Sequence, residues 1–147
     1  MESSELLTKA YRLINLYNAK AKKPHTYSNG MVLFPAQSHM IEIIGESGGI
    51  TVTQIAEEYM ITKGAVSQIL RFLDEKGLVV RTPSPQGGRT TVLSLSEEGQ
   101  RVLAEHRERH RSMTETVAAL ADRLPPELLA ILEEIADTIE KNIRNME

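Results

Sequence analysis

Polar side chains occupy one face of the segment between residues 62 and 71. At helical spacing this face contains no aliphatic residue, and it consists of Thr62, Lys63, Gly64, Ser67, Gln68 and Arg71. Hydrogen-bond donors and short polar groups are what reading base edges in a DNA major groove requires. We therefore predict that this face binds double-stranded DNA, with Ser67 and Gln68 at base edges. Thr62 and Lys63, at the start of the helix, would contact bases or phosphates.

Arg71 and Ser67 each have a second interpretation. As a cation on the predicted DNA face, Arg71 suits a phosphate or the minor groove. It could instead form an ion pair with Asp74 or Glu75, about one turn further along the helix. Ser67 could be an ordinary solvated serine. The spacing of the residues leaves these alternatives open.

Four histidines form the second group of residues that could have a chemical role, because their spacing could allow them to bind a metal ion. His106 and His110 are four positions apart, so on a helix they share one face and could chelate a divalent metal such as zinc. His39 falls in an earlier predicted helix, and His25 falls in the loop before it. Two alternatives remain: a buried cluster of hydrogen-bonded histidines, or a proton switch near neutral pH. The chain has no cysteine, which excludes disulfides, thiolate zinc sites and cysteine nucleophiles.

Composition narrows the class of protein. The 147 residues suit one domain, and 41% hydrophobic with 25% charged residues is ordinary for a globular chain. No apolar run is long enough to span a membrane and no secretory signal is visible, so we expect a cytoplasmic protein. We expect no enzyme, because the sequence lacks a glycine-rich phosphate loop, a nucleophile elbow and a Cys–His pair. The net charge of -3 conceals a basic middle, since residues 63–91 hold five basic residues and two acidic ones, which suits a polyanionic partner.

The elements that must position these side chains follow from periodicity and from turn residues. The patterns predict helices over residues 4–21, 35–47, 51–59 and 63–76, and two more that begin at about 97 and 126. The stretch from Lys22 to Gly30 reads as a loop. Two short strands are predicted at 78–81 and 90–95, joined by a loop rich in proline and glycine. The predicted fold class is therefore mainly α, with one small β-hairpin.

The third and fourth predicted helices have the pattern of a helix pair joined by a short turn. Ala56 is small where two such helices come closest, and the offsets that would face inward hold Ile55, Tyr59, Ile61, Val66 and Ile69. A helix pair followed directly by a hairpin predicts a winged helix-turn-helix. The hairpin, or wing, would add Arg89 and Thr90 to the DNA contacts.

The chain resembles the MarR (multiple-antibiotic-resistance regulator) family of transcription factors. The resemblance is clearest in ITKGAVSQILRFLDEKGLVVR (residues 61–81) and VLSLSEEG (residues 92–99), and in helix order and length it covers nearly the whole chain. It implies one MarR-like domain over 1–147, with a winged helix-turn-helix at 35–95 and dimerisation helices at 1–22 and 97–147. It also implies a homodimer that acts as a ligand-responsive repressor, with double-stranded DNA as its partner and no membrane association. The alternative is a winged-helix scaffold that binds other proteins.

The resemblance also bears on the wing and on the effector. The family commonly has an acidic residue and a second arginine near the wing arginine, whereas Gly87 and Gly88 precede Arg89 in this chain. We therefore expect a less rigid wing with fewer charged contacts.

Zinc-sensing members of the family use histidines at positions that match His39, His106 and His110. Their acidic and thiol ligands are not evident here, although His25 or Glu105 could substitute. Similar histidines in lipid-synthesis regulators suggest a structural role instead, so we expect no required cofactor. An organic effector could occupy a cleft between the dimerisation and DNA-binding parts. The residues that could line that cleft, each more typical of a core, are Tyr11, Tyr17, Tyr27, Met31 and Phe34.

Overall fold

A computed structural model describes residues 3–20, 22–85, 87 and 90–145. In chain order the elements are α1 (Ser3–Lys20), β1 (His25–Thr26), β2 (Val32–Leu33), α2 (Pro35–Ser47), α3 (Val52–Glu58), α4 (Lys63–Glu75), β3 (Val79–Pro83), β4 (Thr91–Leu95), α5 (Glu97–Ala121) and α6 (Pro126–Arg144). The mainly helical fold predicted from the sequence is confirmed, with helix ends close to the predicted ones. Within the described residues, no helix is long and apolar enough to cross a membrane.

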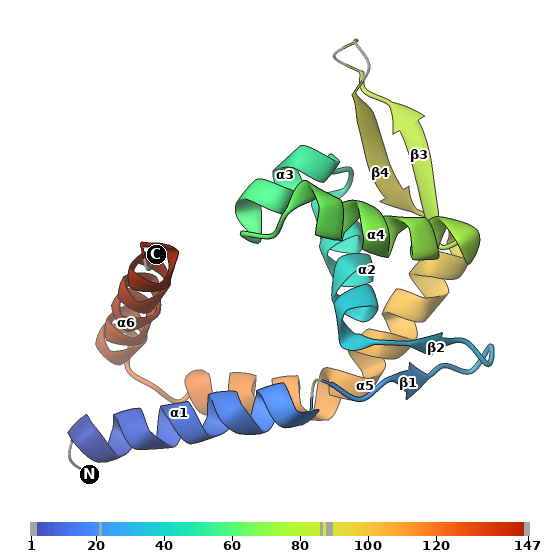
Figure 1. The fold of residues 1–147 in the computed structure, drawn as a ribbon. Coiled ribbons are helices and arrows are strands. Elements are labelled where there is room, and N and C mark those ends of the chain that lie inside the picture. Colours follow the sequence, from blue (N-terminus) through green and yellow to red (C-terminus); the bar gives the residue numbers. More distant parts are fainter. Residues whose placement is uncertain (1–2, 21, 86, 88–89, 146–147) are drawn as a thin grey trace.

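One compact part of the molecule holds the core. Helices α2, α3 and α4 pack with β4 and the first half of α5 around aliphatic side chains, whose fully buried members include Leu33, Ile41, Ile44, Ile55, Val66, Leu70, Leu73, Leu78 and Leu93. The wing, formed by β3 and β4, projects from this part at the end opposite α1 (Figure 1). Helices α1 and α6 lie away from it, and neither packs extensively on it.

Local hydrogen bonds explain where the helices begin. The Thr51 hydroxyl accepts a hydrogen bond from the backbone of Gln54, whose side chain accepts one from the backbone of Thr51, and this capping box opens α3. Ser96 opens α5 in a similar way, by accepting from the backbone N–H of Gly99. Gly99 itself must lack a side chain, because a Cβ there would overlap the carbonyl oxygen of Leu78. The start of α5 is therefore held directly against the base of the wing.

Two inward-facing predictions are wrong. Ile55 and Val66 are fully buried and Ala56 is nearly so, but Tyr59 and Ile61 remain 44% and 36% exposed. The reason is that α3 ends at Glu58, so the helical offsets used to place Tyr59 and Ile61 no longer apply beyond that residue.

The stretch before Gly30 is also more ordered than a loop. Strands β1 and β2 pair in antiparallel register, His25 with Leu33 and Thr26 with Val32, around a turn in which the backbone of Gly30 donates to the carbonyl of Tyr27. Two-residue strands give too little alternation to be recognised in a sequence. This small hairpin connects α1 to α2 and places Tyr27 in the core.

Large apolar side chains remain uncovered on the outlying helices. Those on α1 include Tyr11, Leu13, Ile14, Leu16 and Tyr17, and those on the end of α5 are Met113, Val117 and Leu120. Helix α6 carries an apolar stripe that is equally exposed, at Leu128, Leu129, Leu132, Ile135, Ile139 and Ile143. An apolar surface of this extent typically marks an interaction site.

Candidate nucleic-acid interface

Helix α4 has one buried side and one exposed polar side. Val66, Leu70 and Leu73 point into the core, with Ile69 half-buried beside them. Every residue predicted for the DNA face of this helix is exposed, namely Thr62, Lys63, Gly64, Ser67, Gln68 and Arg71. The burial of the opposite side holds these polar groups outward on a rigid helix.

The beginning of α4 is fixed by Thr62. Its hydroxyl oxygen accepts a hydrogen bond from the backbone N–H of Ala65 at 3.1 Å, which makes Thr62 the N-cap. The hydroxyl hydrogen is not needed for this bond and remains a donor. Lys63 and Gly64 follow in the first turn, both exposed. This end of α4 therefore presents a cation and a small residue to any ligand that approaches it.

The ion pair expected for Arg71 is absent among the described residues. Asp74 is instead engaged by Arg81 of β3, at 2.7 Å between the Arg81 guanidinium and a carboxylate oxygen, and Glu75 forms no ion pair within the described part of the chain. Sequence spacing missed this contact because Arg81 belongs to the next element. The Arg71 guanidinium thus remains exposed on the polar face of α4.

The wing supplies the second predicted contact region. Strands β3 and β4 pair in antiparallel register from Val79 opposite Leu95 to Pro83 opposite Thr91. The next pair continues the ladder, because the backbone of Ser84 donates to the carbonyl of Thr90 at 2.9 Å. Thr90 is exposed at the end of the described wing, whereas Arg89 lies outside the described residues.

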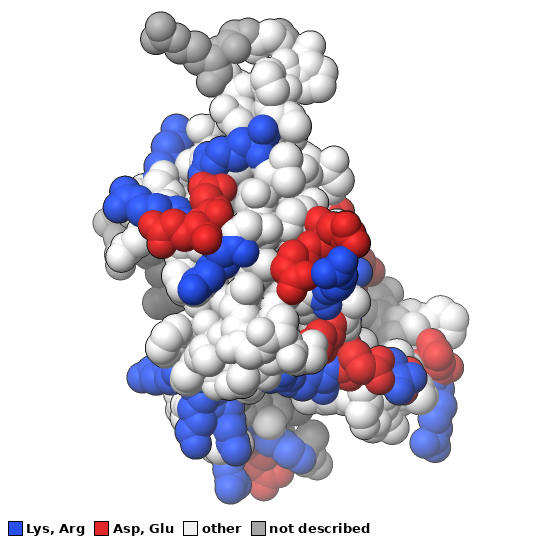
Figure 2. All heavy atoms as spheres, turned by 90° about the vertical axis from the view of Figure 1, so that its right-hand side faces the viewer, with Lys and Arg blue, Asp and Glu red and all other residues white. Residues whose placement is uncertain are grey.

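A groove between α3 and the wing places the predicted Thr90 beside polar groups that sequence reasoning did not select for DNA contact. It is lined by Gly49, Thr51, Gln54, Ser84, Pro85, Gly87, Thr90 and Val92. The spacing of these residues could not reveal the groove, because the antiparallel wing brings Ser84 and Thr90 back towards α3. Figure 2 shows the side of the molecule on the right of Figure 1, where basic and acidic side chains lie next to one another below the wing.

The predicted metal ligands do not form a metal site. Nδ1 of the buried His106 lies 3.1 Å from the Tyr27 hydroxyl, which also lies 2.9 Å from the Ser38 hydroxyl, and Nε2 of His39 lies 2.9 Å from the Tyr17 hydroxyl. The rings of His106 and His110 meet edge to face, with centroids 4.8 Å apart. The described residues contain no group of three or more His, Cys, Asp or Glu side chains that could hold a metal ion. His39, His106 and His110 are thus not gathered into such a group in the described part of the chain, and the contacts favour a structural role for His106.

The surroundings of His106 also set its protonation. Burial lowers the pKa of His106 below its usual value, and the nearby His110 lowers it further. Glu42 opposes the shift, while His39 and Arg109 add to it. His106 is therefore held as a neutral imidazole.

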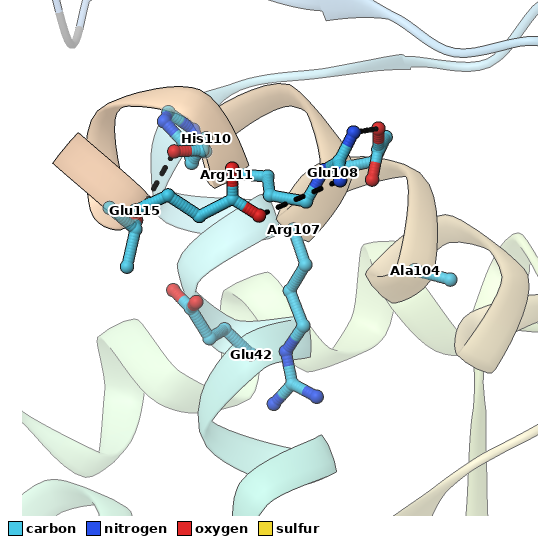
Figure 3. Close-up of a pocket in the computed structure, with 8 residues that line it drawn as sticks. Glu42, Ala104, Arg107, Glu108, His110, Arg111 and Glu115 are labelled. Atoms are coloured by element: carbon cyan, nitrogen blue, oxygen red, sulfur yellow. Dashed lines mark hydrogen bonds and ion pairs between the residues drawn. The ribbon is translucent and has the colours of Figure 1, made fainter. Parts of the chain in front are cut away.

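Figure 3 shows a pocket between α2 and α5 on which His110 borders. Arg107 is paired with Glu46 at 3.2 Å, and Arg111 is paired with Glu108 at 2.9 Å and with Glu115 at 3.5 Å. The arginines of the pocket are thus already matched by carboxylates. None of the residues predicted to line an effector cleft borders this pocket, and one of them, Tyr27, belongs to the core.

Comparison with known proteins finds a similar family for the central part of the chain. Residues 33–90 match the model of the MarR family. Over these residues the chain resembles the MarR family. The match covers the helix pair α3 and α4 and the first strand of the wing, β3.

Curated relatives of this chain are described as transcriptional regulators. MhqR of Bacillus subtilis (strain 168) is 28% identical over 94 residues, which cover 64% of this chain and 61% of MhqR. ZitR of Lactococcus lactis is 25% identical over 112 residues, which cover 76% of this chain and 77% of ZitR. The chain thus spans less than two thirds of MhqR, whereas it spans 89% of an uncharacterised regulator of Bacillus cereus to which it is 26% identical.

Solved structures share the fold over almost the entire chain. FabT of Streptococcus pneumoniae, in complex with DNA, superposes with a TM-score of 0.65 at 23% identity, covering 98% of this chain and 96% of FabT. AdcR of Streptococcus pyogenes, an adhesin competence repressor, gives 0.71 at 20% identity, covering 94% of this chain and 97% of AdcR. The zinc-responsive ZitR gives 0.66 at 21% identity, covering 97% and 99%. At these identities the likeness shows the winged-helix fold alone.

Proposed function

We propose that this chain is a member of the MarR family, a sequence-specific DNA-binding transcriptional regulator that acts as a homodimer. The observation that carries the proposal is the polar outer face of α4, held outward by a fully buried aliphatic side and placed next to the wing. A helix of this kind fits the major groove, while the wing lies on the backbone or in the minor groove. The scaffold alternative is weaker, because a protein interface would favour aromatic anchors that this face lacks.

Individual roles follow from side-chain chemistry. Ser67 and Gln68, in the second turn of α4, read base edges, and Thr62 and Lys63 contact bases or phosphates. Gly64 lets the helix approach the duplex closely. Arg71 from α4, together with Arg89 and Thr90 from the wing, contacts the phosphate backbone or the minor groove.

The homodimer explains the uncovered apolar faces. Helices α1 and α6 both expose large apolar side chains. Their charges are opposite, since α1 carries three basic residues and one acidic residue while α6 carries five acidic and two basic ones. Docking of α1 on α6 of a second copy would bury both faces and pair the charges. Two copies would then present two α4 helices to major grooves about 34 Å apart along one duplex.

Repression and response to an effector are further parts of the proposal. Among the structural neighbours, AdcR is described as a repressor and ZitR as zinc-responsive. A dimer bound to an operator blocks access to that DNA. A ligand with different affinities for the free and the DNA-bound conformations would shift the equilibrium between free and DNA-bound protein. Since the described residues form no metal site, a small organic effector is the form of regulation that we propose.

The test is a binding titration of the protein against the DNA upstream of its own gene, with a random duplex as control. We expect the upstream DNA to bind at least about 1,000-fold tighter than the random duplex at physiological salt. Both affinities should fall steeply as salt rises, because phosphate contacts release counterions. An affinity that does not change with salt concentration, or an equal affinity for both duplexes, would contradict sequence-specific DNA binding.

A further inference from the structure

Arg81 is a basic residue of the wing whose side chain reaches α4, the helix proposed to enter the major groove. Its Nε lies 3.1 Å from one oxygen of the Asp74 carboxylate and 3.3 Å from the other, and its terminal nitrogen lies 2.7 Å from the nearer one. The side chains are 40% and 35% exposed. Two guanidinium nitrogens therefore engage one carboxylate in a forked contact, which fixes direction as well as distance.

The two residues belong to different elements that a tight turn brings together. Asp74 lies in the last turn of α4, and Arg81 is the third residue of β3. Between them the chain reverses at Gly77, which has a left-handed φ of 68°. Two hydrogen bonds hold the start of the strand: the Leu78 N–H donates to the carbonyl of Leu73, and the Ser96 hydroxyl donates to the carbonyl of Gly77.

The ion pair acts beyond this backbone attachment. Arg81 lies opposite Leu93 in the hairpin register, midway between the base of the wing and its last described pair. A contact at that height ties β3 to α4 beyond the turn at Gly77, while two backbone hydrogen bonds between Leu93 and Ile50 hold β4 on the other edge of the hairpin. Figure 2 shows basic and acidic side chains in contact on this side, directly below the wing.

We propose that Arg81 and Asp74 are positioning residues that set the wing against α4 for DNA binding, and that Arg81 is not a phosphate contact. The inference rests on the proposed DNA-binding function. Helix and wing contact separate grooves of one duplex, so an error in their relative angle weakens contacts at one of them. A planar arginine suits this role better than a lysine, because only the guanidinium forms the forked contact.

Substitution of Asp74 distinguishes a phosphate contact from a positioning role for Arg81, because the two roles predict opposite changes in DNA affinity. If Arg81 contacted a phosphate, Asp74→Asn would free it and remove a repelling charge, so DNA would bind more tightly. If the pair positions the wing, Asp74→Asn weakens binding although it makes the DNA side more positive. We expect the affinity for DNA to fall about 3- to 10-fold. This is less than the ~100-fold that a misplacement of about 1 Å can cost, because the positioning error here is modest.

Glu75→Gln is the matched control, since it removes the same charge from the neighbouring residue without breaking an ion pair among the described residues. We expect it to leave the affinity unchanged or slightly raised. Arg81→Lys should weaken binding, and the exchanged variant Asp74→Arg with Arg81→Asp should recover most of the wild-type affinity. A simple loss of folding is detected by thermal unfolding of each variant, and the exchanged variant shows whether the pairing itself matters.

The measurement is the dissociation constant of each variant for the upstream duplex at one salt concentration. Weaker binding by Asp74→Asn, with recovery in the exchanged variant, supports the inference. Equal or tighter binding by Asp74→Asn, or no recovery on exchange, overturns it while leaving the proposed function intact. A wild-type chain that binds no duplex would overturn both proposals.

Discussion

The amide of Gln68 is exposed in the middle of the polar face of α4, where an oxygen and an NH2 group can meet the edge of one base. Replacing it with alanine removes base recognition without changing the charge of the protein. We expect Gln68→Ala to bind random DNA as before and to lose about 1–3 kcal/mol of discrimination at one base pair of the operator. The measurement is a competition between the operator and its single-base variants.

Arg89→Ala is the contrasting variant for this experiment. It should weaken binding to all duplexes similarly and reduce the slope of log K against log salt by about 0.9, the value for one phosphate contact. Equal losses on operator and random DNA for Gln68→Ala would contradict its assignment to a base edge.

His106 makes folding sensitive to acid. Its pKa is lowered in the folded protein, chiefly by burial and then by His110, so the unfolded chain binds the proton more readily. The stabilising contribution is therefore complete above about pH 7 and is lost as the pH falls below the unfolded value of about 6.5. We expect the unfolding temperature to fall between pH 7.5 and pH 5.5, and to fall less in His106→Gln.

The pKa of His25 is lowered as well, first by burial and then by Arg109 and His110, so His25→Gln is the matched comparison. Direct titration of the imidazole resonances assigns the effect to one ring. A His106 resonance that titrates above its usual range would contradict this account.

At the scale of elements, the turn between α3 and α4 contains backbone strain. Met60 has a left-handed φ of 53°, a conformation that costs a residue with a Cβ about 1 kcal/mol or more. Its side chain is 54% exposed, so little packing is lost on removal. We expect Met60→Gly to raise the free energy of unfolding by about 0.5–1 kcal/mol, after allowing for the greater freedom of glycine in the unfolded chain.

Met60→Ala is the control for this turn. It removes the rest of the side chain but keeps the Cβ that causes the strain. The free energy of unfolding, measured with denaturant, should therefore not rise. If alanine stabilised the protein as much as glycine, the gain would come from the lost side chain and not from φ.

The elements show which parts of a structure a sequence can predict. The helices were predictable because their apolar spacing and their capping residues, such as Thr51 and Ser96, act locally. Tyr59 and Ile61 were misplaced because the helical period was continued beyond the end of α3. The partner of Asp74 was missed for a similar reason, since the sequence suggests a neighbour on the same helix, and only the reversal at Gly77 brings Arg81 within reach.

The candidate site was predictable to a different degree. The polar residues of α4 could be selected because one helix contains both the buried and the exposed positions. The histidines could not be assigned in this way, because spacing along α5 brings two rings together without revealing that Tyr27, from a distant hairpin, bonds to His106. Contacts between distant segments depend on packing, and no periodicity encodes them.

At the scale of the whole molecule, the proposed dimer depends on the apolar stripe of α6. Ile135 and Ile139 lie one turn apart on that stripe and are about half exposed. Replacing Ile135 with glutamate would bury an unpaired charge at an interface with a second copy, which costs several kcal/mol there but very little on a free surface. We therefore expect Ile135→Glu to shift the protein to a monomer in light scattering while its unfolding remains cooperative.

The matched control is Glu134→Gln on the same helix, which changes one charge next to the stripe and should leave the dimer intact. Monomers would still carry a complete α4 and wing, so we expect Ile135→Glu to keep weak binding to a half-site. They would lose the large gain in affinity that two linked recognition helices provide, typically 100-fold or more. A dimer that persists in Ile135→Glu would show that α6 does not form the interface, whereas a monomer with undiminished operator affinity would show that one copy suffices to bind.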